Sequence, residues 1–378
     1  MGNTSSVAQG EAPPPATMRR VMLLRPAAKI EDANLGLETV PVPVPRNGEV
    51  LIRVVASPVN PSDYGKFKKD LAPDAEWKPI PMGNEGSGVV VASGGGIFAN
   101  GLVGKSVGFM NLKEQGAWSE YVTASAMMSC FALPASVPVA DGASFFVNPY
   151  TAYAIMDTVR ARGGRAFVHT GAASQVGQMI TKYIASGASD MTVLHVVRRE
   201  EQAQTLRALG AKHVVVTAGD AAIWRAELKR QITELKISLA FDCVAGEMTE
   251  TLVDALPKGS TTFVYGRLSG DAARVAPLDL IYFGKKLEGF LVAGMGQQCW
   301  INFGTKMQML TRLRTASSHV LPALAQGGWA ASKFDDTDLD GWHAAFLDMW
   351  RSSGFTDRKL RICMKGPAAA ATPAEELA

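Results

Sequence analysis

The sequence predicts an α/β protein in which a doubly wound parallel sheet follows a β-rich domain. Residues 166–186 read as a strand, a turn of small residues and a helix, because the spacing of apolar residues changes from a strand period to a helix period. Strands and helices then alternate as far as residue 265, whereas residues 18–147 contain short strands joined by glycine and proline. Alternation of the first kind is typical of a parallel sheet with helices on both faces.

The central stretch begins with the strand Ala166–Thr170 and continues into a helix. The helix is indicated by apolar side chains at helical spacing, namely Val176, Met179, Ile180, Tyr183 and Ile184. Small residues between the two elements would let a diphosphate approach the amides at the start of the helix; they are Gly171, Ala172, Ala173 and Ser174. The glycine positions of the dinucleotide fingerprint fall on Ala172, Ser174 and Gly177, so only the last is glycine. Alone, the turn fits a cofactor site and an ordinary strand connection equally well.

The next predicted strand, Thr192–Val197, ends in Arg198 and Arg199. Dehydrogenases that prefer NAD place an acidic residue about 20 residues beyond the glycines to hold the ribose 2′-hydroxyl, whereas an arginine there suits the 2′-phosphate of NADP. The pair therefore predicts NADP. The alternative is that both arginines, beside Glu200 and Glu201, form only the solvated start of a helix.

Further elements complete the predicted sheet. The pattern gives a helix over residues 200–211, the strand His213–Val216, a helix over 221–235, a strand over 238–243, a helix ending at Leu256 and a strand over 261–265. Beyond these we expect a sixth strand over 287–292, a largely helical stretch over 300–326 with apolar residues at Phe303, Met307, Leu310 and Leu313, a helix over Trp342–Arg351 and a closing strand over 358–364.

The first part of the chain reads as β-structure. After the turn signal Asn47-Gly48, the side chains of Val50, Ile52 and Val54 alternate with their neighbours as in a strand. Short strands follow over residues 105–109, 117–122 and 129–133, and a helix near 147–157 leads into the α/β part. We therefore divide the chain into a lead (1–17), a β-rich domain (18–147 and 320–365), an α/β domain (148–319) and a tail (366–378).

Composition excludes several classes of protein. The 378 residues are 47% hydrophobic and 19% charged, which is ordinary for a globular chain of two domains. A net charge of +3 without clusters of basic and aromatic residues argues against nucleic acid as a partner. No apolar run approaches the ~20 residues of a transmembrane helix. The cysteines are scattered, at Cys130, Cys243, Cys299 and Cys363, which favours the cytoplasm or mitochondrion over secretion.

The two ends of the chain carry little structural signal. Residues 1–17 contain no apolar core for a secretory signal, so we expect a flexible lead. Gly2 followed by Ser6 fits the N-myristoylation pattern, although one acyl chain would anchor the protein only marginally. A cleaved organellar presequence is the alternative, favoured by Arg19 and Arg20 and opposed by Glu11. The tail has no side chains to bury and is expected to be mobile.

Five short motifs, in this order, resemble landmarks of the medium-chain dehydrogenase/reductase superfamily. They are GEVLIRV from Gly48, NPSD from Asn60, GNEG from Gly83, NPYTAY from Asn148 and LEGF from Leu287. The resemblance extends over roughly positions 20 to 365. It implies that the β-rich part is a GroES-like substrate domain and that the α/β part is a Rossmann domain that binds NADP.

The resemblance also bears on metal binding. Zinc alcohol dehydrogenases of this superfamily have an active-site cysteine and histidine where this chain has Asn60 and Asn84, and an asparagine amide is a poor replacement for either ligand. The lobe with four closely spaced cysteines for structural zinc is missing as well. We therefore expect no metal. The motifs NPSD, GNEG and NPYTAY are most similar to the zinc-free 2-enoyl thioester reductases, followed by the quinone reductases.

One departure from the enoyl thioester reductases concerns a tyrosine. Those enzymes have a tyrosine about eight residues after the NPSD motif, thought to polarise the thioester carbonyl, where this chain reads KFKKDL over residues 66–71. Tyr64 is the one candidate nearby. It is equally well interpreted as a packing residue.

The resemblance implies a nicotinamide in the cleft between the domains, with its carboxamide bonded to backbone around Gly289, Phe290 and Leu291. Asn60 and Thr151 line the nicotinamide end in related proteins, and either would orient the acceptor oxygen; the alternatives are a cap before Pro61 and a helix start. The full set of expected cofactor contacts is Gly171, Ala173, Ser174, Gln175, Val176, Gly177, Arg198, Arg199, Val244, Tyr265, Gly266, Phe290 and Leu291. His169 and His195 are interpreted as core residues.

Two functional hypotheses follow. The first is a zinc-independent NADPH-dependent oxidoreductase that passes hydride to a quinone or an α,β-unsaturated carbonyl compound, with an enoyl thioester as a variant. The second is a catalytically weak or inactive scaffold subunit that keeps the fold, which the missing tyrosine and the degenerate turn permit. Relatives commonly form homodimers through the edge strand of the nucleotide-binding sheet, so we expect a homodimer, or a subunit of a larger assembly, that uses residues 287–292.

Overall fold

The computed structural model describes residues 6–7, 13–68, 77–111, 115–294, 297–302, 304–352 and 358–364. Most of the expected lead with Gly2, the expected tail, Phe303 and residues 69–71, near which related reductases have a tyrosine, lie outside these ranges. The chain divides into two compact parts. The β-rich unit comprises Met1–Phe146, Ser332–Gly354 and Arg358–Ala378, and the α/β unit comprises Val147–Ala331 and Phe355–Asp357.

Six parallel strands form the central sheet of the α/β unit. They are β10 (Ala166–Thr170), β11 (Thr192–Val197), β12 (His213–Val216), β13 (Leu239–Asp242), β14 (Thr261–Val264) and β15 (Lys286–Gly289). Their order is β12-β11-β10-β13-β14-β15, and every neighbouring pair is parallel. The predicted doubly wound parallel sheet is confirmed. Its order reverses between β10 and β13, which is where such sheets open a crevice for a ligand.

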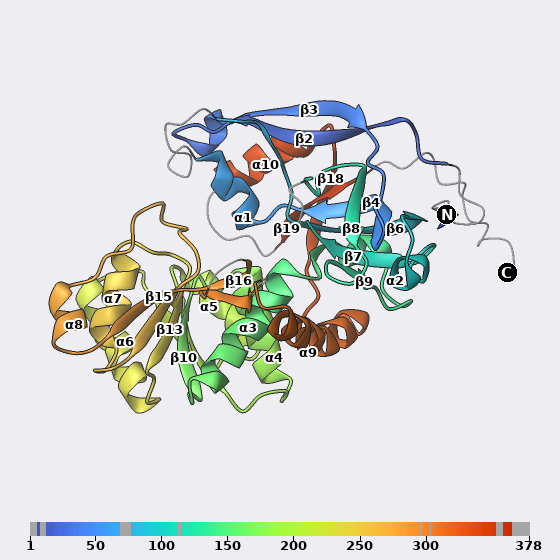
Figure 1. The fold of residues 1–378 in the computed structure, drawn as a ribbon. Helices are drawn as coiled ribbons and strands as arrows, with labels where there is room; N and C mark the ends of the chain where they lie inside the picture. The colour runs from blue at the N-terminus through green and yellow to red at the C-terminus, as the bar shows by residue number, and fades with distance from the viewer. Residues whose placement is uncertain are drawn as a thin grey trace, which may run out of the picture. The chain divides into compact units, whose positions relative to one another are not determined.

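Helices cover both faces of this sheet. They are α3 (Val147–Ala161), α4 (Gln175–Ala185), α5 (Glu200–Ala208), α6 (Ala221–Glu234), α7 (Glu247–Ala255), α8 (Pro277–Ile281) and α9 (Lys306–Ala325). Figure 1 shows α3 and α4 on one side of β10 and β13, with α6 and α7 on the other. The alternation of side chains explains this: Val168 of β10 packs in one cluster with Leu228 of α6 and Leu252 of α7.

The chain leaves the sheet at Phe290, and a single strand over residues 287–292 is therefore wrong. The Phe290 amide donates to the Val264 carbonyl at 2.9 Å, whereas the Leu291 amide donates to the Gln298 carbonyl at 3.1 Å. After β15 the chain thus forms a separate parallel pair, β16 (Leu291–Gly294) with β17 (Cys299–Asn302). Burial of the Phe290 ring, 5.4 Å from the Phe241 ring, accounts for the break.

The helix expected over residues 300–326 begins later than expected. Trp300 and Ile301 are buried in β17, and α9 starts at Lys306 after a turn in which the Gly304 amide donates to Asn302 Oδ1 at 2.8 Å. This helix belongs to the α/β unit, since the hydroxyl oxygens of Tyr150 and Ser317 lie 2.6 Å apart. The α/β unit accordingly runs to Ala331, beyond the expected residue 319.

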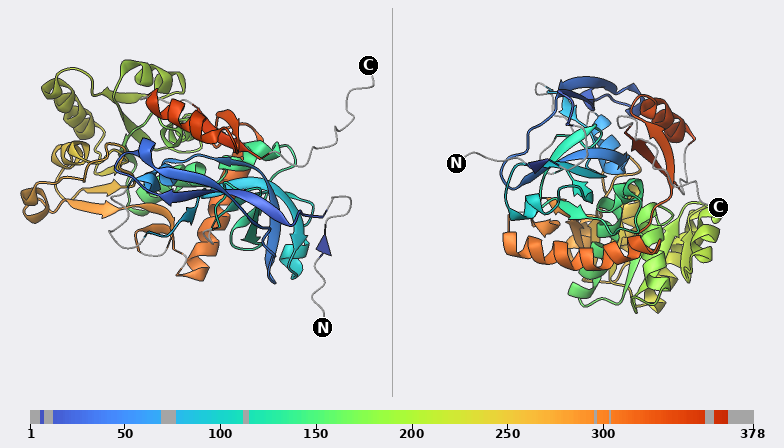
Figure 2. Two further views of the ribbon diagram at one scale, coloured as in Figure 1. Left: turned by 90° about the horizontal axis from the view of Figure 1, so that it is seen from above. Right: turned by 90° about the vertical axis from the view of Figure 1, so that its right-hand side faces the viewer.

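Two sheets build the β-rich unit, and their strands pair antiparallel except for the parallel pair of β18 and β19. The larger sheet contains β1 (Ser6–Val7), β4 (Glu49–Pro58), β6 (Glu85–Ser93), β7 (Ser106–Met110), β8 (Tyr121–Ser125), β9 (Cys130–Ala132), β18 (Phe334–Asp338) and β19 (Lys359–Cys363), in the order β18-β19-β4-β6-β7-β9, with β1 on β6 and β8 on β4. The smaller contains β2 (Thr17–Arg25), β3 (Asn34–Pro41) and β5 (Ile80–Pro81). Figure 2 shows β2 and β3 running side by side.

Short helices complete this unit, and two strands differ from expectation. The helices are α1 (Pro61–Tyr64), α2 (Ile97–Asn100), α10 (Trp342–Arg351) and the 3-10 turns η1 (Ile30–Asp32), η2 (Gly65–Phe67) and η4 (Val139–Ser144). Strand β8 lies later than the expected 117–122 because the amides of Ala117 and Trp118 bond instead to the carbonyls of Gly83 and Met82. Strand β18 was not predicted, since its sequence FDDTD lacks an apolar alternation.

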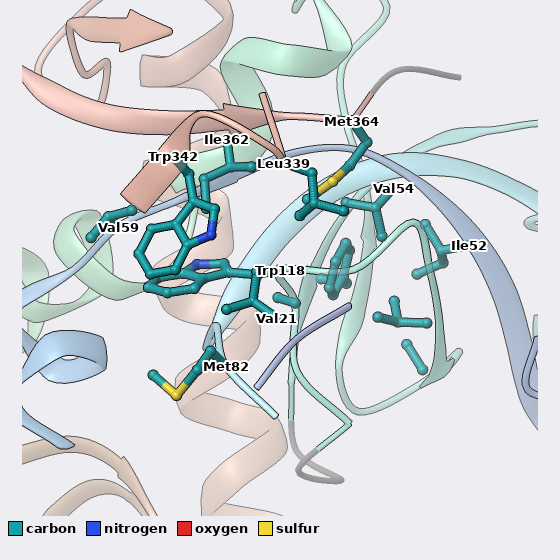
Figure 3. Packing of buried hydrophobic residues seen from close by; sticks show 14 of the residues in the cluster. Val21, Ile52, Val54, Val59, Met82, Trp118, Leu339, Trp342, Ile362 and Met364 are labelled. Carbon is teal, nitrogen blue, oxygen red and sulfur yellow. The ribbon is translucent and has the colours of Figure 1, made fainter. Parts of the chain in front are cut away.

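The core of the β-rich unit joins residues from both ends of its sequence. The rings of Trp118 and Trp342 lie 4.8 Å apart, and both side chains are buried (Figure 3). Ile52 of β4 and Ile362 of β19 are fully buried in the same cluster. Strand β4 ends two residues before Asn60, and strands β6 and β19 begin at Glu85 and Lys359, polar residues discussed below. All three strands are therefore held by tight packing. Across the described part of the chain, no helix is both long and apolar enough to span a bilayer.

Candidate functional site

The turn between β10 and α4 directs its alanines inward. Ala172 and Ala173 are buried and pack with Leu206 of α5. Gly171 has φ +56°, and a Cβ atom added there would lie 2.5 Å from Cys243 Sγ. Only glycine fits at that position, because other residues rarely adopt this conformation and a side chain would collide with the thiol. The turn is thus lined by backbone.

Helix α4 begins directly against this turn. Ser174 is its N-cap, and the Ser174 hydroxyl oxygen accepts a long hydrogen bond from the Gly177 amide at 3.4 Å. A Cβ atom added at Gly177 would lie 2.0 Å from the Ala172 carbonyl oxygen, so glycine is required for this close packing. Gln175 and Val176 form the half-buried first turn, which carries the positive end of the helix dipole. Backbone and small residues in this arrangement fit a diphosphate.

Arg198 and Arg199 leave β11 at the same edge of the sheet. The parallel register aligns Thr170 with Val196, so the arginines and the turn after β10 follow neighbouring strand ends. Both arginine side chains are exposed, and their backbone amides donate to Gln202 Oε1 at 3.0 and 3.2 Å. Arg199 is also the N-cap residue of α5. The positions agree with the predicted 2′-phosphate contact and equally with the alternative of a solvated helix start.

Asp242 ties the end of β10 to the turn after β13 and to α7, and sequence reasoning missed it. Its buried carboxylate accepts hydrogen bonds from the hydroxyls of Thr170 (2.7 Å) and Thr249 (2.6 Å) and from the amides of Val244 (2.9 Å) and Ala245 (3.2 Å). The predicted cofactor residue Val244 is thereby held in place. An aspartate followed by a glycine-containing turn is the signal that could have pointed to it, because such carboxylates often bond to amides two or three residues onward.

Tyr265 turns its hydroxyl into the α/β unit. That oxygen lies 2.6 Å from His169 Nε2, and burial raises the pKa of Tyr265 well above its usual range. The hydroxyl of Tyr265 is thus engaged within the α/β unit, although the residue as a whole is only half-buried. Gly266 follows at a close approach, since an added Cβ atom would lie 2.9 Å from the Cys243 carbonyl oxygen.

The two strand histidines are core residues, as the sequence indicated. Both are fully buried, and burial lowers the pKa of each to about 3, so neither carries charge at neutral pH. His195 Nε2 lies 3.1 Å from the Thr181 hydroxyl. Burial likewise raises the pKa of the Cys243 thiol to about 12, which makes it an inert packing group.

Phe290 and Leu291 differ in exposure. The Phe290 ring is buried in an aromatic cluster, whereas the Leu291 side chain is 47% exposed. The amides of both residues are already engaged with carbonyls of the protein. These two N–H groups are therefore not available to the nicotinamide carboxamide that was expected to bond to this stretch.

In the β-rich unit, Asn60 is fully buried and bonded on both sides of its amide. Asn60 Nδ2 donates to Glu85 Oε1 at 3.0 Å, and Asn60 Oδ1 accepts from Lys359 Nζ at 2.7 Å. Lys359 Nζ also donates to the Ser144 hydroxyl at 3.0 Å, and the second Glu85 oxygen accepts from the Phe146 amide at 2.9 Å. We call Asn60, Glu85, Lys359 and Ser144 the buried polar centre. Sequence reasoning found Asn60 and missed its two partners.

Asp63 adds a second carboxylate beside this centre. Its Oδ2 atom accepts from the Asn60 amide at 2.8 Å, the bond that caps α1, and its buried Oδ1 atom has no partner among the described residues. Burial raises the pKa of Asp63 to about 7, against the opposing charge of Lys66. Burial also lowers the pKa of Lys359 to about 8, against the charges of Glu85 and Asp63. Asp63 and Lys359 therefore both have pKa values close to neutral pH.

The other two catalytic candidates have structural partners. The Tyr64 ring lies 5.6 Å from the Phe346 ring and 5.5 Å from the Trp350 ring, as its interpretation as a packing residue requires. The Thr151 hydroxyl donates to the Val147 carbonyl, one helical turn earlier, at 2.5 Å. Their catalytic roles stay predictions.

Asn84 lies next to the buried polar centre but is only half-buried. It accepts from Lys66 Nζ at 3.2 Å and donates to the Ser62 hydroxyl at 3.0 Å. Within the described ranges, no group of three or more histidine, cysteine, aspartate or glutamate side chains is arranged to hold a metal ion. The four cysteines are unpaired with one another.

Comparison with known proteins matches both units. The model of the alcohol dehydrogenase GroES-like domain matches residues 46–135, and that of the zinc-binding dehydrogenase domain matches residues 176–308. The mitochondrial enoyl-[acyl-carrier-protein] reductase of Xenopus tropicalis is 31% identical over 268 residues, which is 68% of this chain and 73% of that protein. The human protein of the same name is 28% identical over 275 residues, or 70% and 69% of the two chains.

Solved structures show the same architecture. A protein from Mesorhizobium loti assigned as an NADPH:quinone reductase superposes with a TM-score of 0.77 at 28% identity, covering 93% of this chain and 100% of the other. An enoyl thioester reductase from Candida tropicalis, in a mutant form, superposes with a TM-score of 0.69 at 20% identity, covering 92% and 99%. The fold is therefore shared across reductases of different named acceptors.

Proposed function

The chain belongs to the medium-chain dehydrogenase/reductase superfamily, with the enoyl reductases and quinone reductases, and from this premise we propose that it is an NADPH-dependent oxidoreductase. The proposed acceptor is a quinone or an α,β-unsaturated carbonyl compound, and the names of its relatives favour an enoyl thioester among these. Bound NADPH would supply the hydride.

The observation that carries this proposal is the glycine-dependent contact between the β10–α4 turn and α4. An added Cβ atom at Gly177 would lie 2.0 Å from the Ala172 carbonyl oxygen, so the start of α4 packs closely against the turn. The amides at this helix start form the proposed anion-binding site, which we call the dinucleotide seat. Arg198 and Arg199 follow the neighbouring strand and would hold the 2′-phosphate. Asp242 would keep Val244 in position after β13, which borders β10 on the side opposite to β11.

The acceptor is proposed to react without zinc. Asn60 and Asn84 carry amides where zinc dehydrogenases have a cysteine and a histidine, and an amide is a weak zinc ligand. An enone or a quinone is already electron-poor, so orientation and a hydrogen-bond donor at the acceptor oxygen supply the activation. Asn60 is held by Glu85 and Lys359 and would help to orient the acceptor oxygen.

A dinucleotide titration followed by an acceptor screen tests the proposal. We expect NADPH to raise the thermal midpoint of the purified chain more than NADH does, and NADPH oxidation to be observed with at least one of a set of quinones, short enones and enoyl thioesters. Binding without oxidation of any acceptor would favour the alternative of a catalytically inactive scaffold subunit. Absence of binding to either dinucleotide would contradict the cofactor assignment.

Arginine variants sharpen the cofactor assignment. Replacing both Arg198 and Arg199 with alanine should raise the Kd for NADPH by about 10- to 100-fold and leave the Kd for NADH within about threefold, because charge-assisted bonds to the 2′-phosphate are lost. Arg165→Ala is the matched control, since this arginine precedes β10 at the opposite end of the strand and its side chain is 86% exposed. An unchanged Kd for both dinucleotides would instead support the solvated helix start.

We further propose that the chain forms a homodimer and works in the cytoplasm or mitochondrion. Strand β15 is an edge of the six-stranded sheet, and Leu278, Ile281 and Tyr282 just before it are exposed apolar residues. Edge strands and apolar patches of this kind favour pairing of two copies. Sedimentation equilibrium that gives a monomer at all concentrations would contradict the dimer. The curated relatives named above are mitochondrial proteins, and fractionation of cells would decide between the two compartments.

A further inference from the structure

Three polar side chains form a linked group beside the buried polar centre. Lys66 Nζ donates to Asn84 Oδ1 at 3.2 Å, and Asn84 Nδ2 donates to the Ser62 hydroxyl at 3.0 Å. Ser62 is exposed and the other two are half-buried, so the group borders solvent. We call it the Ser62–Asn84–Lys66 trio. Both oxygen and nitrogen of the Asn84 amide are used, which fixes its orientation and directs the lysine.

The backbone under Asn84 is rigid. The Asn111 amide donates to the Asn84 carbonyl at 2.8 Å, and Asn111 Nδ2 donates to the Gly83 carbonyl at 2.9 Å. Gly83 has φ +97°, and a Cβ atom added there would lie 2.6 Å from the Trp118 backbone nitrogen. Trp118 is itself fully buried. Asn84 therefore holds the Lys66 ammonium group from a fixed support rather than from a mobile loop.

The charge of Lys66 is not neutralised at close range by a described acidic residue. A lysine ammonium group has three N–H donors, and the bond to Asn84 uses one of them. In the described ranges no carboxylate oxygen lies within ion-pair distance of Lys66 Nζ. The positive charge of Lys66 acts on the buried Asp63, since it is the largest effect that opposes the rise of the Asp63 pKa. The ammonium group thus retains donors for a ligand oxygen.

The neighbouring aromatic residue is directed elsewhere. Tyr64 precedes Lys66 by two residues but packs on Phe346 and Trp350, which belong to α10. Figure 1 shows α1 and α10 in the same part of the β-rich unit. Tyr64 is accordingly occupied by packing, whereas the ammonium group of the half-buried Lys66 is held in place by Asn84.

We propose that Lys66 is the electrophilic residue of the reductase site, whose ammonium group, held by Asn84, donates a hydrogen bond to the carbonyl oxygen of the acceptor. The proposal rests on the reductase function proposed above. Bound NADPH would supply the hydride for the β carbon of the acceptor and would leave as NADP+. The carbon–carbon π pair of the acceptor would then move toward the carbonyl, and negative charge would develop on its oxygen. Lys66 stabilises that charge and stays an ammonium ion, while a proton from water completes the reduction at the α carbon.

Substitutions at three positions test the catalytic effect. Lys66→Met keeps the side-chain length and removes the charge, and we expect kcat with an enone to fall about 100-fold while the Kd for NADPH stays within twofold. Lys66→Arg should retain at least about a tenth of the wild-type kcat, because it keeps a charged donor. Asn84→Ala should lower kcat about 10-fold by releasing the lysine. Lys68→Met is the matched control, since Lys68 is also half-buried and lies two residues away.

An infrared measurement tests the contact without turnover. The carbonyl stretching band of cyclohex-2-en-1-one, bound to the protein without NADPH, should lie at lower frequency in wild type and in Lys68→Met than in Lys66→Met. A kcat for Lys66→Met within threefold of the Lys68→Met value, or a band that does not respond to Lys66→Met, would overturn the proposal. If wild type binds NADPH but reduces no acceptor, the reductase function fails, and the band alone then decides whether Lys66 binds the carbonyl.

Discussion

The two polar regions of the molecule are built in different ways. The proposed dinucleotide seat in the α/β unit consists mainly of backbone, with Gly171 and Gly177 where a side chain would collide with the protein. The buried polar centre in the β-rich unit consists of side chains, in which Asn60 joins a carboxylate to an ammonium group. Backbone sites tolerate changes in side-chain identity as long as the small residues stay. Side-chain sites depend on each partner.

The first way to break this comparison is to add a side chain to the seat. Gly177→Val should abolish measurable dinucleotide binding, a loss of at least about 100-fold in Kd, because its Cβ atom would lie 2.0 Å from the Ala172 carbonyl oxygen and displace α4. Fluorescence titration with NADPH measures the effect. Circular dichroism and thermal unfolding establish whether the rest of the unit is retained.

Gly101→Ala serves as the control for this substitution. Gly101 lies in the β-rich unit with φ −69°, and the nearest atom to an added Cβ would be 3.3 Å away, so the change needs only a small adjustment. Its NADPH affinity should match wild type. Retained binding by a folded Gly177→Val protein would mean that the seat does not depend on the contact between turn and helix.

The second change removes one partner from the buried polar centre. Lys359→Met leaves Asn60 Oδ1 and the Ser144 hydroxyl without their donor and Glu85 without a balancing charge, so the free energy of unfolding should fall by about 3–5 kcal/mol. Urea unfolding at neutral pH measures this loss. A fall below about 1 kcal/mol would show that the centre contributes little to stability.

A double-mutant cycle identifies the source of that loss. Glu85→Gln removes the opposite charge and keeps the shape, and the combination with Lys359→Met should cost clearly less than the sum of the two single changes. Additive effects would mean that the two residues act independently, although both bond to Asn60. The opposite charges of Glu85 and Lys359 would then not be the reason for the burial of Lys359.

The same difference explains how much the sequence could predict. Spacing along the chain predicted the parallel sheet, the turn after β10 and the position of Arg198 and Arg199, because these features are local. Glu85 is 25 residues from Asn60, and Lys359 is 299 residues from it. No periodicity links such residues, since they meet only when β4, β6 and β19 pair. Contacts of this kind need the fold.

Errors within the α/β unit have a similar origin. The run over residues 287–292, LEGFLV, reads as one strand from its sequence. In the structure the Phe290 ring packs against Phe241 and Phe263, and the chain changes its strand partner there. Asp242 was overlooked because its importance lies in four hydrogen bonds from three different elements. Secondary-structure propensity describes the conformation that a segment prefers by itself, and it does not predict which other segment it will pack against.

The third change uses pH to test the charge of the β-rich unit. Burial raises the pKa of Asp63 from 3.8 to about 7, so between pH 4 and pH 7 the folded protein keeps a proton that the unfolded chain has lost. The stabilisation that this proton provides is present below about pH 4 and is lost as the pH rises toward 7. Asp63→Asn carries no such proton.

The free energy of unfolding of wild type, relative to Asp63→Asn, should therefore fall by on the order of 2–4 kcal/mol between pH 4 and pH 7. Taking the difference cancels His169 and His195, which titrate in both proteins, and Lys359 keeps its proton throughout this window because its pKa is about 8. Asp190→Asn, at a carboxylate with 74% exposure, should give a difference that changes by less than about 0.5 kcal/mol. If the difference for Asp63→Asn also stays constant between pH 4 and pH 7, Lys66 and the Asn60 amide keep Asp63 ionised. The buried polar centre together with Asp63 would then carry a net negative charge at every physiological pH.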